Sequence, residues 1–347
     1  MRILFYIAKQ YSVPIILPLA RVCRKKNIEY ALLISRQVGD ILPDEWRNDT
    51  ICYDRKDASI FNPDFVLCPG NFVDFRLPGI KVQLFHGLGV EKESHYKIRH
   101  FFDIYCTSGP FVTRRFEQLQ AKYKYFMIME TGWPKVDYIL NFDNNELNIK
   151  YNIQGYKTVV LYAPTFSKRM ESATDLLPYL KNIICNDEIW ILKFHELMDK
   201  ELVAEIESGS SDNIRIIDTY DITPLLYLAD VMISDTSSVI YEFMVLNKPV
   251  VTYKTQSRID KAINITEPEE LRPAIDQALS ESCTERNRKQ LLEINPYLDG
   301  RISEKLINRL EEIVQHPEFL PKYKKPLNLY RKMQIMYHEH FRKGYLR

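Results

Sequence analysis

The stretch of sequence that decides the fold reads DVMISDTSSVIYEFM (residues 230–244). Its first half is an apolar run typical of a buried strand, and its last six residues have the apolar spacing of a helix. Between these halves stand the small polar residues Asp235, Thr236, Ser237 and Ser238. The turn has two interpretations. It is an ordinary helix N-cap, or it is an anion site in which hydroxyl groups and backbone N–H groups at a helix N-terminus hold a phosphate.

Apolar strand-like segments alternate with helix-like segments along most of the chain. Strands are predicted at residues 2–8, 29–34, 65–68, 81–85, 125–129, 158–163, 189–193, 214–217, 231–234 and 249–253. Helices are predicted at 14–26, 110–120, 173–185, 199–208, 223–228, 239–246, 268–281, 284–294 and 302–315. Short apolar strands separated by helices indicate α/β architecture with parallel sheets.

The length of the chain and one polar stretch predict two domains. A chain of 347 residues exceeds what one typical core supports. Residues 141–155 are polar and read as a linker. We therefore expect two doubly wound Rossmann-type domains facing a central cleft, at 1–145 and 155–315, followed by a C-terminal segment at 316–347.

The composition predicts a reduced cytoplasmic protein. The chain is 46% hydrophobic and 27% charged, with a net charge of +1, so nothing in its overall charge favours nucleic acid. Its six cysteines are scattered without metal-binding spacing, and several of them lie within apolar runs and are interpreted as reduced core residues. The apolar segment at the N-terminus is too short for a signal peptide, and no apolar run reaches the length of a membrane span.

Four polar clusters directly follow predicted strands. They are residues 86–87 with His86, residues 164–169 with Thr165, Lys168 and Arg169, residues 193–196 with His195, and residues 235–238. Ligands of doubly wound sheets bind beyond the carboxyl ends of the strands, where these clusters lie. For any single cluster, hydrogen-bonded packing is a comparable explanation.

Taken together, the clusters predict a phosphate site with two histidines. Ser237 and Ser238 could hold a pyrophosphate, with positive charge from the loop at 164–169, and Glu242 lies one helical turn further on, suited to a ribose. One histidine could take a proton from an attacking hydroxyl, and the other could stabilise charge on the transferred phosphate. P-loop and dinucleotide fingerprints are absent. Carboxylate-rich metal clusters are absent too, although one divalent cation is compatible with the sequence.

The clusters, in this order, resemble the CDP-glycerol glycerophosphotransferase family, the teichoic-acid primases and polymerases with a GT-B fold. The likeness is carried by QLFHG (83–87), TGWPKVD (131–137), VLYAPTF (160–166), LKFH (192–195), ISDTSSVIYEF (233–243) and YLDGR (297–301). The resemblance implies an N-terminal acceptor-side domain and a C-terminal nucleotide-donor domain. It also implies transfer of glycerol phosphate or a similar alditol phosphate from a CDP-activated donor to an acceptor hydroxyl, with release of CMP.

The resemblance also implies roles for individual residues. His86 would be the catalytic base, His195 would contact the donor phosphate, and Arg301 would lie close to the donor. The acceptor would be a polyol phosphate or a lipid-linked saccharide in the synthesis of a teichoic-acid-like or capsule polymer. No cofactor is required by this resemblance. Phe85 and Thr236 stand where the family has Trp and Tyr, which leaves the acceptor and the alditol open.

Two other functions remain open at this point. A GT-B glycosyltransferase with a nucleotide-sugar donor would use the same phosphate site. A non-catalytic scaffold of a polysaccharide assembly complex would retain the fold without turnover.

The segment after Pro321 is basic and aromatic. Its cations are Lys322, Lys324, Lys325, Arg331, Lys332, Arg342, Lys343 and Arg347, against the single acid Glu339. A basic amphipathic helix of this kind could lie on the anionic inner face of the cell membrane. Alternatively, the helix packs back onto the domains with its basic face in solvent. RNA binding is a weaker option, because the overall charge is balanced.

Overall fold

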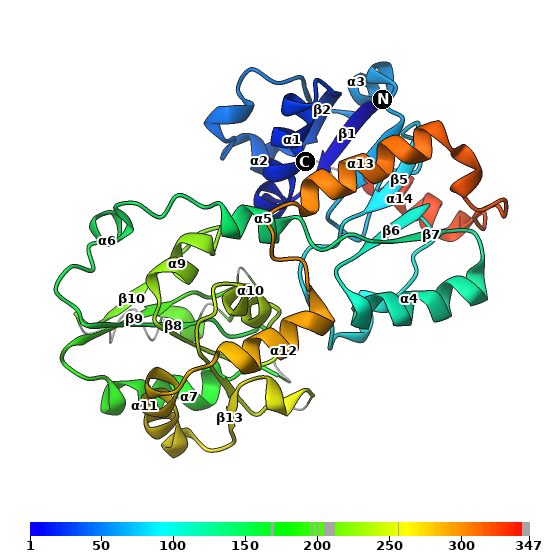
Figure 1. The fold of residues 1–347 in the computed structure, drawn as a ribbon. Helices are drawn as coiled ribbons and strands as arrows, with labels where there is room; N and C mark the ends of the chain where they lie inside the picture. The colour runs from blue at the N-terminus through cyan, green and yellow to red at the C-terminus, as the bar shows by residue number, and fades with distance from the viewer. Residues whose placement is uncertain (168–169, 196, 200, 205–211, 256, 342–347) are drawn as a thin grey trace. The chain divides into compact units, whose positions relative to one another are not determined.

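The computed structural model describes residues 1–347 apart from 168–169, 196, 200, 205–211, 256 and 342–347. The chain forms two compact units (Figure 1), one from Met1–Asn141 with Glu293–Arg347 and one from Phe142–Leu292. Each unit is built on one parallel sheet flanked by helices. The α/β class and the two doubly wound sheets predicted from the sequence are confirmed.

The first unit has a seven-stranded parallel sheet in the order β3-β2-β1-β4-β5-β6-β7. Its strands are β1 (Arg2–Ile7), β2 (Glu29–Ile34), β3 (Ile51–Cys52), β4 (Phe65–Cys68), β5 (Ile80–Gln83), β6 (Ile104–Thr107) and β7 (Met127–Glu130). Its helices are α1 (Val13–Lys25), α2 (Arg36–Gly39), α3 (Arg55–Phe61), α4 (Pro110–Tyr123), α5 (Lys135–Leu140), α13 (Ile302–Gln315) and α14 (Leu329–Phe341). Residues 3–7 of β1 are all buried, as expected for a central strand covered on both faces.

The second unit has a six-stranded parallel sheet in the order β10-β9-β8-β11-β12-β13. Its strands are β8 (Thr158–Tyr162), β9 (Glu188–Leu192), β10 (Ile214–Ile216), β11 (Val231–Ser234), β12 (Val250–Tyr253) and β13 (Ile263–Ile265). Its helices are α6 (Leu147–Lys150), α7 (Ala173–Ile183), α9 (Thr223–Leu228), α10 (Val239–Val245), α11 (Leu271–Ser280) and α12 (Thr284–Ile294), of which α12 runs into the first unit. The helix predicted at 199–208 falls largely outside the described residues.

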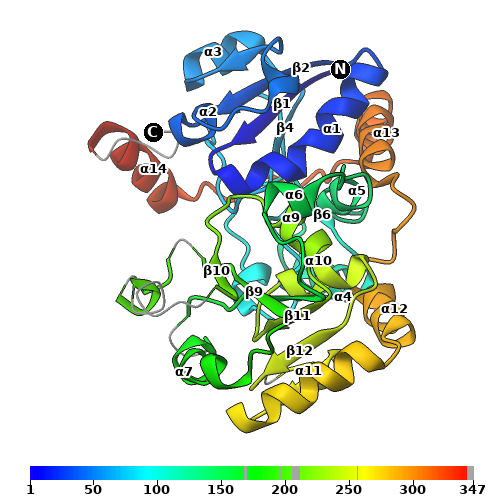
Figure 2. The ribbon, with the colours of Figure 1, turned by 90° about the vertical axis from the view of Figure 1, so that its left-hand side faces the viewer.

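Helices pack on both faces of the second sheet (Figure 2). Apolar residues of α7 and α11 form one core with the β-strands that includes the buried Trp190, while α9 and α10 lie on the opposite face. Because both faces are covered, β8 and β11 are continuous apolar runs without a polar side. This is why their sequences predicted strands clearly.

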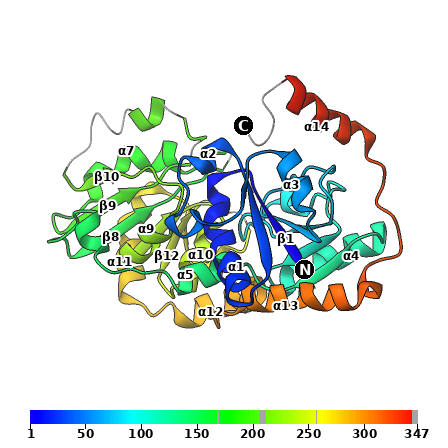
Figure 3. The same cartoon turned by 90° about the horizontal axis from the view of Figure 1, so that it is seen from above.

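The second domain was predicted to extend to residue 315, whereas the structure groups Glu293 and the residues after it with the first unit. α13 packs along α1 (Figure 3) and also contacts α5. The Asp137 carboxylate of α5 accepts hydrogen bonds from the backbone N–H groups of Ile302 (3.1 Å) and Ser303 (2.6 Å), which caps α13. The apolar stripe of α13 is visible in the sequence, but the partner it packs against is not.

The structure also bears on the cysteines and on membrane crossing. All six cysteines are free, and five are buried, whereas Cys185 is exposed. In the described part of the chain, no helix combines the length and the apolar character needed to cross a bilayer.

Candidate functional site

Each sheet has one point at which its strand order reverses. In the first unit this point lies between β1 and β4, and in the second unit it lies between β8 and β11. Loops on the two sides of such a point diverge and leave a crevice at the carboxyl ends of the strands. Thr165 follows β8 and residues 235–238 follow β11, so the predicted donor residues of the second unit flank its reversal point.

The Asp235 carboxylate joins the two loops at this point. It is buried and accepts hydrogen bonds from the backbone N–H of Thr165 (3.0 Å) and from both the backbone N–H and the hydroxyl of Ser172 (3.1 Å each). It also accepts from the backbone N–H of Thr236 at 2.6 Å. Burial raises the pKa of Asp235 to about 6, although the hydrogen bonds act in the opposite direction.

The donor contact predicted for Asp235 stays a prediction, and the structure shows its carboxylate in contact with protein groups. Its carboxylate faces the loop at 165–172 and has its acceptor sites occupied by protein N–H and O–H groups. Asp235 therefore positions Thr165 and Ser172, on the loop after β8, relative to the hydroxyl turn at 236–238. Sequence reasoning missed this role because the partners lie 63 and 70 residues away along the chain.

The hydroxyl residues of the turn are half-buried at the start of α10. Ser238 is the N-cap residue and has helical backbone angles (φ −69°, ψ −18°), and its side chain makes no capping hydrogen bond. The N-cap interpretation therefore does not account for the Ser238 hydroxyl. Glu242 lies in the first turn of α10 with its side chain buried.

His195 follows β9, the neighbour of β8, and its ring is exposed. Its Nδ1 accepts a hydrogen bond from the backbone N–H of Leu197 at 3.1 Å, so the proton of the neutral ring resides on Nε2. The His195 ring lies 4.3 Å from the ring of Phe166, which belongs to the loop after β8. The structure thus brings His195 together with that loop and presents an N–H donor suited to a phosphate oxygen.

The other residues predicted in the loop after β8 are Thr165, Lys168 and Arg169, and the structure describes only the first of them. Thr165 is buried, and its backbone N–H is committed to Asp235. Lys168 and Arg169 lie outside the described residues.

His86 follows β5 in the first unit, and its ring reaches solvent. The surrounding protein partly removes the imidazole from water, which disfavours its charged form, and the positive charges of Arg99 and Lys92 disfavour that form as well. Together these effects lower the pKa of His86 to about 4. The ring is therefore neutral near pH 7, the state that a proton acceptor needs. Tyr11, just after β1, places its ring 5.6 Å from that of His86. Sequence reasoning missed Tyr11, because the first 80 residues carry no recognisable motif.

Phe85, directly before His86, has φ of +61°. A bulky residue in this left-handed region is strained by about 1–3 kcal/mol, and such strain persists only where surrounding contacts hold it. The Phe85 ring stacks on His95 at 4.5 Å with an interplanar angle of 18°. His95 is thus a packing residue.

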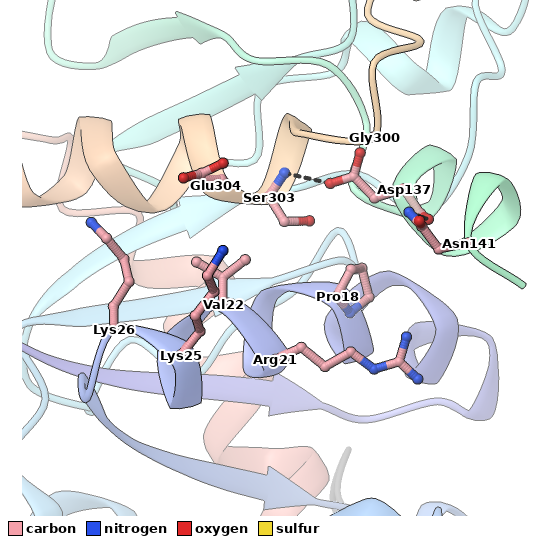
Figure 4. Close-up of a pocket in the computed structure, with 10 residues that line it drawn as sticks. All are labelled: Pro18, Arg21, Val22, Lys25, Lys26, Asp137, Asn141, Gly300, Ser303 and Glu304. Atoms are coloured by element: carbon pink, nitrogen blue, oxygen red, sulfur yellow. Dashed lines mark hydrogen bonds between the residues drawn. The ribbon is translucent and has the colours of Figure 1, made fainter.

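Arg301 lies in the first unit, at the N-terminus of α13. Its guanidinium donates to Glu304 at 3.0 Å. Arg301 therefore belongs to a different unit from the other predicted donor residues, which lie in the second unit. A pocket of about 480 Å³ lies beside it (Figure 4), lined by Pro18, Arg21, Val22, Lys25, Lys26, Asp137, Asn141, Gly300, Ser303 and Glu304.

In the described parts of the chain, no group of three or more His, Cys, Asp or Glu side chains is placed to hold a metal ion.

The two Rossmann-type units define a GT-B-like protein, and the comparison with solved structures agrees. The wall teichoic acid polymerase TagF superposes with a TM-score of 0.68 at 15% identity, covering 91% of this chain and 89% of the other. At this level of identity the likeness concerns the fold.

The sequence comparisons give the family. The sequence model of the CDP-Glycerol:Poly(glycerophosphate) glycerophosphotransferase family matches residues 86–259, half of the chain. The chain belongs to this family, which confirms the resemblance seen in the motifs.

Two curated relatives show how far the similarity extends. The teichoic acid glycerol-phosphate primase of Bacillus subtilis is 26% identical over 204 residues, covering 54% of this chain and 52% of the relative. The teichoic acid poly(glycerol phosphate) polymerase of Bacillus spizizenii is 30% identical over 138 residues, covering 36% of this chain and 34% of the relative. The chain therefore spans about half or less of the length of these relatives.

The role of Asp235 predicts a specific effect of Asp235→Asn. The new amide N–H would face backbone N–H donors, so we expect a loss of roughly 1–3 kcal/mol in the free energy of unfolding. We also expect weaker CDP binding, because the turn at 236–238 loses its anchor. Urea denaturation and calorimetric titration with CDP measure the two effects.

Asp230→Asn is the matched control. Asp230 stands at the opposite end of β11, and its exposed carboxylate accepts from the backbone N–H of Val159 at 2.8 Å. We expect it to leave CDP affinity unchanged. Equal CDP affinity in Asp235→Asn and the natural protein would contradict the positioning role.

Proposed function

We propose that the protein transfers an alditol phosphate, glycerol phosphate or a close analogue, from a CDP-activated donor to an acceptor hydroxyl and releases CMP. The product would be a teichoic-acid-like or related cell-surface polymer. Membership of the glycerophosphotransferase family and the activities named for the two relatives support this proposal. The observation that carries it is the arrangement of hydroxyl residues at 236–238 after β11, at the reversal point of the second sheet, with His195 after β9 on the other side of β8.

On the donor side, the second unit would bind the diphosphate. The hydroxyls of Ser237 and Ser238 and the first N–H groups of α10 would contact the phosphate oxygens. His195 would donate from Nε2 to the transferred phosphate, where negative charge must be stabilised as the bond to CMP breaks. Glu242 would accept from the ribose hydroxyls. Thr165 and the cations Lys168 and Arg169 would complete the donor loop.

On the acceptor side, His86 would act as the base. The acceptor oxygen attacks the phosphorus that carries the alditol, the bond from this phosphorus to the bridging oxygen breaks, and CMP leaves with that oxygen. The proton of the attacking hydroxyl passes to His86, which is neutral near pH 7 because of its lowered pKa. The charges of Arg99 and Lys92 near His86 favour an anionic acceptor, such as a polyol phosphate or a phosphate-bearing lipid-linked saccharide.

The direct test is CMP release by the purified protein from CDP-glycerol or CDP-ribitol in the presence of polyol-phosphate and glycolipid acceptors. We expect turnover in the natural protein and a fall of about 10²-fold or more in His86→Ala and in His195→Ala. His316→Ala, which alters an exposed histidine paired with Glu318, is the control and should keep full activity.

Melting temperatures in the presence of nucleotides identify the donor class. A ligand that binds the folded state raises the melting temperature, so we expect a rise with CDP. The proposal fails if no acceptor supports CMP release. Stabilisation by UDP and not by CDP would favour a nucleotide-sugar donor instead.

We also propose that α14 and the segment before it bind an anionic membrane surface, where a lipid-linked acceptor would be found. The segment exposes seven large apolar side chains, each at least half exposed: Tyr323, Leu327, Leu329, Tyr330, Met333, Met336 and Tyr337. A cluster of exposed apolar groups among cations is typical of interfacial helices. The segment is also anchored to its own unit, since Lys325 pairs with Asp103 at 2.8 Å and Ile335 is buried.

Vesicle co-sedimentation tests this surface. We expect several-fold stronger binding to vesicles rich in phosphatidylglycerol than to phosphatidylcholine vesicles, and weaker binding at high salt. The double variant Leu329→Ser, Met333→Ser should bind less, because it removes apolar area from the helix. Ile60→Ser with Leu292→Ser, two similarly exposed positions on other helices, is the control. Equal binding of all variants would contradict the proposal.

A further inference from the structure

The backbone that carries His86 is held at the residue before it. Phe85 adopts φ of +61°, two residues after the end of β5. The carbonyl of Phe85 belongs to the peptide bond that leads into His86. The orientation of this peptide therefore sets the direction in which the imidazole leaves the backbone.

Trp133 contacts this peptide directly. Its indole Nε1–H donates a hydrogen bond to the Phe85 carbonyl at 3.2 Å, and both residues are buried. The Phe85 ring is fixed at the same time by edge contact with Phe116 at 5.4 Å and by stacking on His95. Ring and carbonyl are thus held independently, so the left-handed conformation has two separate supports.

Trp133 is itself fixed by the segment that returns to the first unit after α12. Its backbone N–H donates to Oδ1 of the fully buried Asn295 at 2.8 Å, and Nδ2 of Asn295 donates to the carbonyl of Tyr297 at 3.1 Å. Gly132 before it has φ of +88°, and a Cβ atom there would lie 2.8 Å from the side chain of Ile302. These contacts fix the position of Trp133 next to the peptide bond between Phe85 and His86.

We propose that Trp133 is a positioning residue for His86: its indole N–H fixes the Phe85–His86 peptide and thereby aims the imidazole at the acceptor. This inference rests on the proposed function, in which His86 takes the proton of the acceptor hydroxyl. A base must be held within hydrogen-bond reach of that proton, and small displacements cost rate more than they cost substrate binding. Trp133 does not touch substrate in this account.

Trp133→Phe tests the proposal. The substitution keeps a buried aromatic ring but removes the indole N–H donor and the part of the indole that carries it. We expect kcat for CMP release to fall about 10- to 100-fold with little change in the KM for the donor. Trp46→Phe is the matched control. Trp46 is also fully buried in the first unit, and its indole N–H has no hydrogen-bond partner in the described structure. We expect this variant to keep kcat.

A second readout does not depend on turnover. NMR titration of the protein follows the imidazole of His86, which should titrate below its ordinary pKa of 6.5 in the natural protein and in Trp46→Phe. In Trp133→Phe the ring is no longer held in one orientation relative to the surrounding protein and the charges of Arg99 and Lys92, so its pKa should shift back toward 6.5.

The kinetic measurement and the titration distinguish failure of the proposed function from failure of the positioning role of Trp133. If the natural protein releases no CMP, the proposed function fails, and the titration still decides whether Trp133 holds His86. The positioning role would be overturned if Trp133→Phe had the same kcat as the natural protein and His86 titrated with the same pKa in both. If that variant does not fold, the same measurements on Asn295→Ala decide, because this change releases the backbone N–H of Trp133.

Discussion

The buried carboxylate of Asp235 is the interaction on which the geometry of the second unit depends. A parallel doubly wound sheet leaves a crevice where its strand order reverses, and the loops there diverge. Asp235 ties the loop after β8 to the turn after β11 across that crevice. Since the buried carboxylate needs all of these donors to offset its loss of hydration, neither loop can move without exposing unmet hydrogen-bonding groups. The half-buried hydroxyls at 236–238 are thereby held on a rigid base.

In the first unit, a strained backbone conformation fixes the position of the candidate catalytic residue. His86 also follows a strand of a doubly wound sheet, but a left-handed residue, Phe85, sets its direction. Its aromatic neighbours and the indole of Trp133 hold that conformation. One unit thus supplies an anchored hydroxyl turn suited to phosphate, and the other supplies a neutral imidazole suited to proton transfer.

The sequence predicted those features that local pattern determines. β8 and β11 are buried on both faces, so their apolar runs were clear, and the positions of His86 and His195 followed from the ends of their strands. The two-residue strand β3 was missed because so short a segment has no pattern to read. The role of Asp235, the unit of Arg301 and the contact between Trp133 and Phe85 depend on pairs 48 to 166 residues apart, which no local pattern specifies.

In the proposed function, the hydroxyl turn after β11 holds the diphosphate of a cytidine nucleotide. A crystal structure of the protein soaked with CDP-glycerol tests it most directly. We expect diphosphate oxygens within hydrogen-bond distance of the Ser237 and Ser238 hydroxyls and of Nε2 of His195. A nucleotide bound elsewhere, with these three groups in contact only with water, would contradict it.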